Sequence, residues 1–116
     1  MRESAHIKVY GHCYPAPASL YEALLALSGE AIGAEDSNIP VVEQEGDMVR
    51  LSFEGDYFPV EDMLQCLAAH LSPQCEGKVD VLDLDAWTLV RHSIVGAEVH
   101  SAPARSLNHV LDYSGH

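Results

Sequence analysis

The sequence predicts an α+β fold in which two helices cover one face of a mainly antiparallel sheet. Three features lead to this prediction. A strand runs directly into an amphipathic helix at residues 48–71, another strand and helix occupy residues 6–28, and the last third of the chain is β-rich. Two such strand–helix units around a hairpin are typical of the split β-α-β, ferredoxin-like, two-layer sandwich. This comparison concerns architecture alone and implies no iron–sulfur cluster.

Residues 48–71 carry the clearest secondary-structure signal. From Val49 to Phe53 apolar and polar residues alternate, which is the period of a strand with one buried face. Pro59 fits the first turn of a helix, where its missing N–H costs nothing. Apolar residues then recur at helical spacing, namely Val60, Met63, Leu64, Leu67 and Leu71. The helix is predicted to end before Pro73.

Residues 6–14 are predicted to form the first strand. One face carries Ile7, Val9 and Cys13, which the alternation assigns to the core. The other face carries Lys8, Tyr10, His12 and Tyr14. We interpret this outward face as a candidate partner-binding surface, because aromatic side chains often anchor protein interfaces.

The first helix is predicted to follow a proline-rich turn. Ser19 and Glu22 have the spacing of a capping box ahead of an apolar run. Gly29 is the predicted C-cap, and the alternative is a helix that continues to Gly33. A hairpin is then predicted, with a three-residue loop at residues 45–47.

The last third of the chain is predicted to contain strands at residues 78–84, 87–95 and 97–100. Trp87 is assigned to the core beneath the helices. Residues 104–116 fit a short helix or a strand equally well, so the sequence leaves their conformation open.

Composition narrows the function classes. All 116 residues are assigned to a single domain, residues 1–116, with 18 acidic and 6 basic residues and a net charge of −12. Such a surface repels nucleic acid and anionic membranes, and it attracts basic protein surfaces within a Debye length of about 8–10 Å. No signal peptide or membrane-spanning run is expected. Three cysteines, an odd number, favour a reducing compartment, so a cytoplasmic protein is expected.

Asp80, Asp83 and Asp85 form a second candidate partner-binding group around a predicted hairpin. Clustered carboxylates are also the ligands of hard cations. The spacing does not match an EF-hand loop, however, so an acidic hairpin tip is the preferred interpretation.

Cys66, His70 and Cys75 are the candidate metal ligands. Cys66 and His70 are four residues apart on the predicted helix, so their side chains are neighbours. Cys75 follows the helix and, with His12 or Cys13 as a fourth ligand, could complete a zinc site. The alternative is that these cysteines are simply buried. No other cofactor is expected.

The function expected from these features is a non-enzymatic protein-binding module whose acidic surface is directed at a basic partner. A narrower version is a nucleic-acid-mimicking inhibitor of the kind that phages and mobile elements use, with no direct binding to nucleic acid or membrane. One alternative is a small metal-binding protein or enzyme that uses Cys66, His70 and Cys75. Another is a structural subunit of a bacterial assembly, in which an edge strand pairs into a homodimer.

Overall fold

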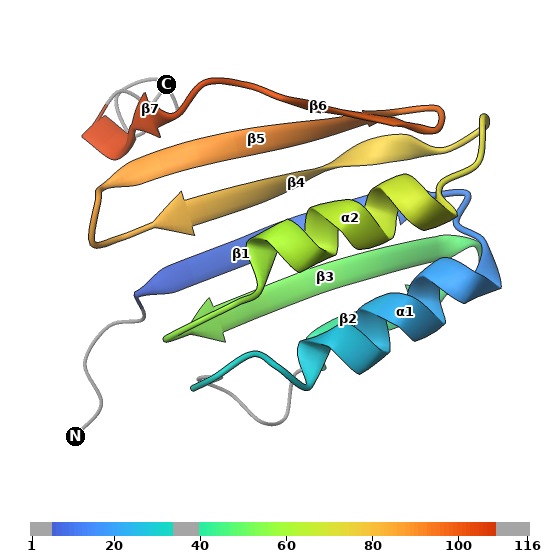
Figure 1. The fold of residues 1–116 in the computed structure, drawn as a ribbon, viewed down its shortest axis with the longest axis horizontal. Helices are drawn as coiled ribbons and strands as arrows, with labels where there is room; N and C mark the ends of the chain where they lie inside the picture. The colour runs from blue at the N-terminus through green and yellow to red at the C-terminus, as the bar shows by residue number, and fades with distance from the viewer. Residues whose placement is uncertain (1–5, 34–39, 109–116) are drawn as a thin grey trace.

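The structure, a computed structural model, describes residues 6–33 and 40–108. Within this part of the chain the fold is α+β, with two helices on one face of a seven-stranded antiparallel sheet (Figure 1). The predictions made for residues 1–5, 34–39 and 109–116 lie outside the described residues.

The elements follow the predicted order. They are β1 (Ile7–Tyr14), α1 (Ala18–Ser28), β2 (Val42–Glu45), β3 (Met48–Gly55), α2 (Val60–His70), β4 (Glu76–Asp83), β5 (Thr88–Val95), β6 (Glu98–Ser101) and β7 (Arg105–Ser106). The strands lie side by side in the order β2-β3-β1-β4-β5-β6, and β7 pairs with β5. β1 therefore lies at the centre of the sheet, between β3 and β4.

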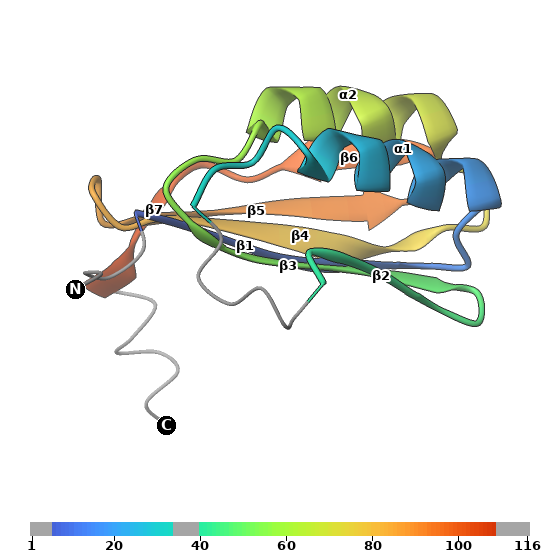
Figure 2. The same cartoon turned by 90° about the horizontal axis from the view of Figure 1, so that it is seen from below.

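Figure 2 shows the two helices together on one side of the sheet. The apolar core lies between these helices and the face of the sheet that they cover. Helix α1 buries Leu20 and Leu24, and α2 buries Met63 and Leu67. The sheet contributes the alternate residues of its central strands, namely Val9, Cys13, Val49, Leu51, Phe53, Val79, Val81 and Ile94. Burial of each large side chain stabilises the fold by about 1.5–3 kcal/mol.

Helix α1 begins before the predicted capping box. Pro17 is the N-cap residue and no side chain caps the helix, so the prediction for Ser19 and Glu22 is wrong. The reason is that Pro17, at φ −64°, lets the helix start at the next residue and leaves Ser19 inside the first turn. The predicted C-cap at Gly29 is confirmed.

The β2–β3 hairpin has a two-residue loop rather than the predicted three-residue loop. Glu45 pairs with Met48, which leaves only Gly46 and Asp47 between the strands. Gly46 has a φ of +60°, and a tight hairpin favours glycine at this first loop position.

Trp87 lies in the turn between β4 and β5, and its assignment to the core is wrong. Its side chain is 43% exposed and its φ is +61°. The register of the hairpin, in which Asp83 pairs with Thr88, explains this position because it leaves Trp87 outside both strands. The indole Nε1 donates to Oδ1 of Asn108 at 2.9 Å instead.

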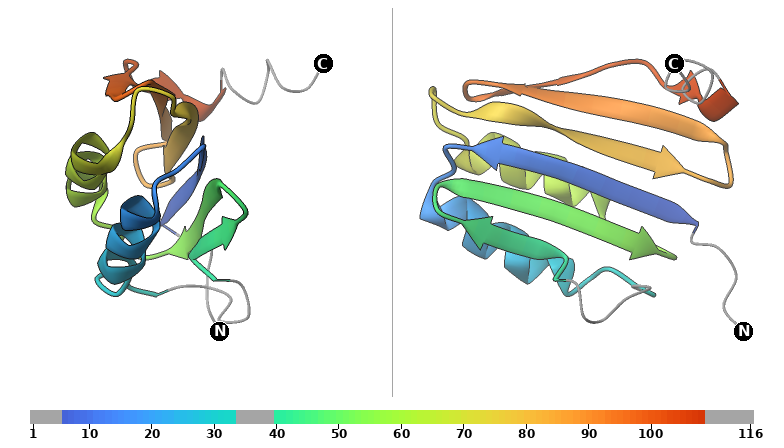
Figure 3. Two further views of the ribbon diagram at one scale, coloured as in Figure 1. Left: turned by 90° about the vertical axis from the view of Figure 1, so that its right-hand side faces the viewer. Right: turned by 180° about the vertical axis from the view of Figure 1, so that it is seen from behind.

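The face of the sheet opposite the helices is mostly open in the part of the chain that the structure describes (Figure 3). Only the end near the β4–β5 turn is covered. There β7 pairs with β5, and Leu107 donates its backbone N–H to the carbonyl oxygen of Trp87 at 2.9 Å. Leu89 and Leu107 are buried at this end, outside the helix-side core.

Candidate functional site: the two charged faces

Charge differs between the two faces of the molecule. The lysines and arginines of the described residues are Lys8, Arg50, Lys78, Arg91 and Arg105, and every one lies on a strand. Helices α1 and α2 carry none of them. Their exposed charged residues are Glu22, Glu61 and Asp62, and the exposed Glu30 follows Gly29, the C-cap of α1. We call these four residues the helix carboxylates.

The helix carboxylates have no ion pair or hydrogen-bond partner among the described residues. Glu61 and Asp62 lie in the first turn of α2, where the positive end of the helix dipole favours them. Glu22 lies one turn from Leu25, whose side chain is 46% exposed. The helix layer thus combines unpaired negative charge with exposed apolar surface.

The open face has a different pattern, with charges of both signs in rows across the strands. Arg50, His12 and Lys78 lie on three adjacent strands and are direct cross-strand neighbours. Adjacent strands lie about 4.8 Å apart, so these side chains form one continuous row. Like charges directly opposite each other destabilise a sheet. We call Arg50, His12 and Lys78, together with Ser93 on β5, the Lys78 row.

A second row lies two residues further along each strand. Tyr14 pairs with Glu76, Glu76 with Val95, and Val95 with Glu98. We call these four residues the Glu76 row. Tyr14 is 53% exposed and Val95 is 62% exposed, so the row combines carboxylates with large exposed apolar groups.

Ion pairs neutralise part of the open face. Arg50 lies 3.6 Å from a carboxylate oxygen of Glu43 and 3.2 Å from one of Glu45. Lys78 and Glu76, in contrast, form no ion pair with any other described residue. They are the unpaired charges of their respective rows.

Two shallow depressions hollow the open face. One, of about 500 Å³, is centred on β1 and is lined by residues that include Tyr10, His12, Arg50 and Lys78. The other, of about 700 Å³, lies toward the β5 end of the same rows and shares His12 and Lys78 with the first. The Lys78 row therefore runs along both hollows, with His12 and Lys78 where they meet.

The four candidate residues on β1 all face away from the helices, as the alternation predicts. Their surroundings differ, however. The hydroxyl of Tyr10 donates to a carboxylate oxygen of Glu54, and partial burial together with Glu54 raises the pKa of Tyr10. His12 and Tyr14 are exposed, and His12 lines both depressions. Lys8 is half-buried and lies near the end of the face where the β4–β5 turn closes.

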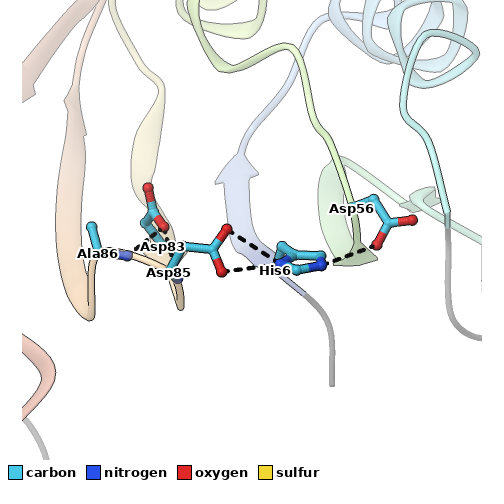
Figure 4. A network of polar contacts seen from close by, with 5 residues as sticks. All are labelled: His6, Asp56, Asp83, Asp85 and Ala86. Carbon is cyan, nitrogen blue, oxygen red and sulfur yellow. Dashed lines mark hydrogen bonds and ion pairs between the residues drawn. The ribbon is translucent and has the colours of Figure 1, made fainter. Parts of the chain in front are cut away.

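The carboxylates around the β4–β5 turn are engaged in local contacts (Figure 4). Oδ1 of Asp83 accepts hydrogen bonds from the backbone N–H groups of Asp85 and Ala86, both at 3.0 Å. Asp85 in turn lies 3.0 Å from Nδ1 of His6, and the other ring nitrogen of His6 lies 4.0 Å from Asp56. Because Asp83 caps the turn and Asp85 holds His6, their carboxylates contribute to the fold.

Asp80, the remaining member of this group, is bound by Arg91. Nε and Nη2 of Arg91 lie 2.7 and 2.8 Å from the two carboxylate oxygens of Asp80. The structure therefore does not bring Asp80, Asp83 and Asp85 together as one free acidic group.

Two of the three cysteines are buried thiols. The thiol of Cys13 contacts that of Cys75, and burial, with a smaller effect of Cys75, raises the pKa of Cys13 to about 12. Sγ of Cys75 donates to the carbonyl oxygen of Pro15 at 3.0 Å. Burial also raises the pKa of the half-buried Cys66. A thiol with a raised pKa is a poor nucleophile at neutral pH.

The candidate zinc ligands do not converge. Within residues 6–33 and 40–108 no three His, Cys, Asp or Glu side chains are grouped closely enough to hold a metal ion. Nδ1 of His70 lies 3.1 Å from Oγ of Ser19 on α1. The zinc hypothesis for Cys66, His70 and Cys75 thus stays a prediction from spacing.

Two features of the open face do not follow from the sequence, namely the Lys78 row and the close approach of the β1 and β4 backbones. The Lys78 row depends on the pairing of β1 with both β3 and β4, which no short-range pattern encodes. Gly11 and Gly77 lie beside this row, where a Cβ on Gly11 would lie 2.6 Å from the carbonyl oxygen of Lys78, and one on Gly77 would clash with that of His12. Gly11, inside the predicted strand 6–14, was the available signal, because a glycine in a strand often marks a close backbone approach. Gly77 lies just before the predicted strand 78–84 and gave no such signal.

No protein-family model, no curated protein and no solved structure matches this chain. In the described part of the chain, neither helix is long and apolar enough to cross a membrane.

Proposed function

We propose that this chain is a non-enzymatic protein-binding module that directs its helix layer at a basic surface of a partner protein. The observation that carries the proposal is the separation of charge: the helix carboxylates have no lysine or arginine beside them on either helix. A net charge of −12 attracts a basic partner over a long range, and the unpaired helix carboxylates orient that partner toward the helix layer.

The helix layer has what a binding surface requires. Its carboxylates are exposed and unpaired, so contact with a partner breaks no existing ion pair. Leu25 adds apolar contact area next to Glu22. Charged groups at such a rim mainly increase the association rate and orient the partner, whereas the apolar contacts slow dissociation.

In this proposal the acidic binding surface lies on the helices, and not around the β4–β5 turn as expected from the sequence. Asp80, Asp83 and Asp85 already bind Arg91, backbone N–H groups and His6. A partner would have to compete with these contacts, whereas Glu61 and Asp62 are available without such a cost.

The narrower version of the proposal is that the basic partner is a nucleic-acid-binding protein and that the helix carboxylates occupy the place of phosphates. Nucleic-acid grooves of proteins are lined with lysine and arginine, which supply most of their affinity. This version makes a separate prediction, namely that DNA or RNA competes for the same surface of the partner.

We also infer that the core of the fold has the ferredoxin-like arrangement. The order β1-α1-β2-β3-α2-β4 and the strand order β2-β3-β1-β4 support this inference, with β5 and β6 as additions at one edge. The arrangement by itself implies no activity. The three free cysteines further support a reducing compartment such as the cytoplasm.

The test is capture of partners from the native host's lysate on the immobilised chain, at about 0.1 M and about 1 M salt, where the Debye length is about 10 and 3 Å. The proposal predicts that a basic protein binds at low salt, is released at high salt and is lost when Glu22, Glu61 and Asp62 are changed to the uncharged amides. Capture that persists in this triple variant contradicts it. Release by added DNA distinguishes the narrower version.

A further inference from the structure

We propose that two copies of this chain associate through their open sheet faces, with the Lys78 row of each copy against the Glu76 row of the other. This inference does not rest on the proposed function, because it concerns the opposite face of the molecule. It rests on the unpaired charges of the two rows, on their order along the strands and on the exposed Tyr14.

The geometry of the rows makes the face complementary to itself. Consider a two-fold axis that runs across the strands, midway between the two rows. Rotation about this axis places β4 on β4 and exchanges the rows, so Lys78 of one copy faces Glu76 of the other. The same contact occurs twice, as in every two-fold interface. Both charges lack an ion-pair partner within the described part of their own chain.

The charges also select the orientation. A two-fold axis parallel to the strands would place each row on itself, with Lys78 against cations and Glu76 against carboxylates. Like charges in contact across an interface oppose association. The rows therefore favour the arrangement in which the facing strands run antiparallel. Packed sheets accept this arrangement when their strands lie within about 30° of each other.

Shape adds to this complementarity. The exposed Tyr14 belongs to the Glu76 row, and the depression of about 500 Å³ on β1 borders His12 in the Lys78 row. Exchange of the rows places Tyr14 of the second copy over His12, at the rim of this depression. A tyrosine that enters a pocket is a frequent anchor of protein interfaces.

The rest of the fold is compatible with this interface. Among the described residues, the segment that covers part of the open face is the one around Leu107, near the β4–β5 turn. Glu76 and Lys78 lie at the opposite end of β4, whose strand is seen from the open side in Figure 3. The edge strands β2 and β6 have only four residues each, which limits pairing through the sheet edge. A dimer built this way presents its two helix layers on opposite outer surfaces.

The test is sedimentation equilibrium of the full chain at about 0.1 M and about 1 M salt, since screening shortens the range of charge contacts about threefold. We expect a monomer–dimer equilibrium whose dissociation constant increases at high salt. Lys78→Glu and Glu76→Lys should each raise the dissociation constant by about tenfold or more, because each change acts twice across the axis. The double variant exchanges the two charges and should restore association to within about threefold of the original chain.

Matched controls separate this contact from the effect of net charge. Lys8→Glu lies on the same face outside the two rows, and Glu61→Lys lies on α2; each should leave the dissociation constant unchanged within about twofold. A chain that stays monomeric at about 1 mM, a limit near the weakest measurable association, overturns the inference. The inference is also overturned if both controls weaken the dimer as strongly as Lys78→Glu does. It is overturned as well if the double variant unfolds at the same temperature as the original chain but does not regain its association.

Discussion

Arg91 binds Asp80 through two parallel hydrogen bonds across the β4–β5 pair, with Nε and Nη2 at 2.7 and 2.8 Å from the two carboxylate oxygens. The contact raises the pKa of Arg91 through the hydrogen bonds to Asp80. Because the guanidinium presents both donors in a fixed plane, the pair also fixes the register of the two strands. Asp80 is consequently a structural residue of the open face.

The pair should therefore contribute to stability. Its Arg91 side chain is half exposed, so we expect a coupling energy of only about 0.5–1 kcal/mol in a double-mutant cycle of Asp80→Asn and Arg91→Gln. Urea unfolding of the four chains measures it. A coupling energy of zero would contradict a stabilising contribution from this pair.

The close approach of β1 and β4 depends on Gly77. A Cβ at this position would clash with the carbonyl oxygen of His12, at a φ of +156° that side chains rarely adopt. Gly77→Ala should lower the free energy of unfolding by about 3 kcal/mol or more. Gly29→Ala is the matched control, because Gly29 has an ordinary helical φ and a Cβ would meet only a carbonyl oxygen at 3.4 Å. We expect the control to change stability by less than about 1 kcal/mol.

His92 should make the fold sensitive to mild acid. It is 5% exposed, its Nδ1 lies 2.7 Å from Oγ of Ser101, and burial lowers its pKa, against a smaller opposing effect of Asp80. The unfolded chain, with a histidine pKa of about 6.5, therefore binds more protons than the folded chain just below that pH. The stabilising contribution of neutral, buried His92 is present above about pH 6.5 and is lost as the pH falls through the lowered pKa of His92 in the folded state.

The variant His92→Gln tests this dependence. Its unfolding free energy should fall less steeply than that of the original chain between about pH 7 and about pH 5. His100→Gln, on the exposed strand β6, is the control and should keep the original slope. An unchanged slope in His92→Gln would show that another group causes the acid sensitivity.

The thiols should differ in reactivity. Cys13 and Cys75 are buried, whereas Cys66 is only half buried. A maleimide added to the folded chain near pH 7 should therefore label one thiol first, at Cys66, and the other two only as the chain unfolds. Mass spectrometry of tryptic peptides identifies the labelled site. Rapid labelling of Cys13 would contradict the burial and the raised pKa assigned to it.

Much of the fold follows from local patterns. The alternation in β1 and β3 assigns both faces of each strand correctly, and the apolar spacing from Val60 to Leu67 identifies the buried side of α2. Such patterns succeed because a strand or helix buries one face whatever its neighbours are. The position of Trp87 could not be inferred in this way, since it depends on where the β4–β5 turn closes.

The sites follow from the sequence only in part. The outward position of Tyr14 and His12 is a local property and was predictable. The row that joins His12 to Arg50 and Lys78 is not, because it requires the strand order of the sheet. The engagement of Asp83 in the β4–β5 turn and of Asp80 by Arg91 likewise depends on register, so the sequence alone does not reveal that these carboxylates already have partners within the chain.

The most direct measurement of the proposed function compares two triple variants of equal charge against the basic partner. One changes three of the four helix carboxylates, Glu22, Glu61 and Asp62, to the uncharged amides. The other changes Glu43, Glu45 and Glu98 on the edge strands to glutamine. Binding measured by titration calorimetry at about 0.1 M salt should weaken by about tenfold or more in the first variant and by less than about threefold in the second. Equal weakening in both would mean that net charge alone attracts the partner, and would contradict a binding surface on the helix layer.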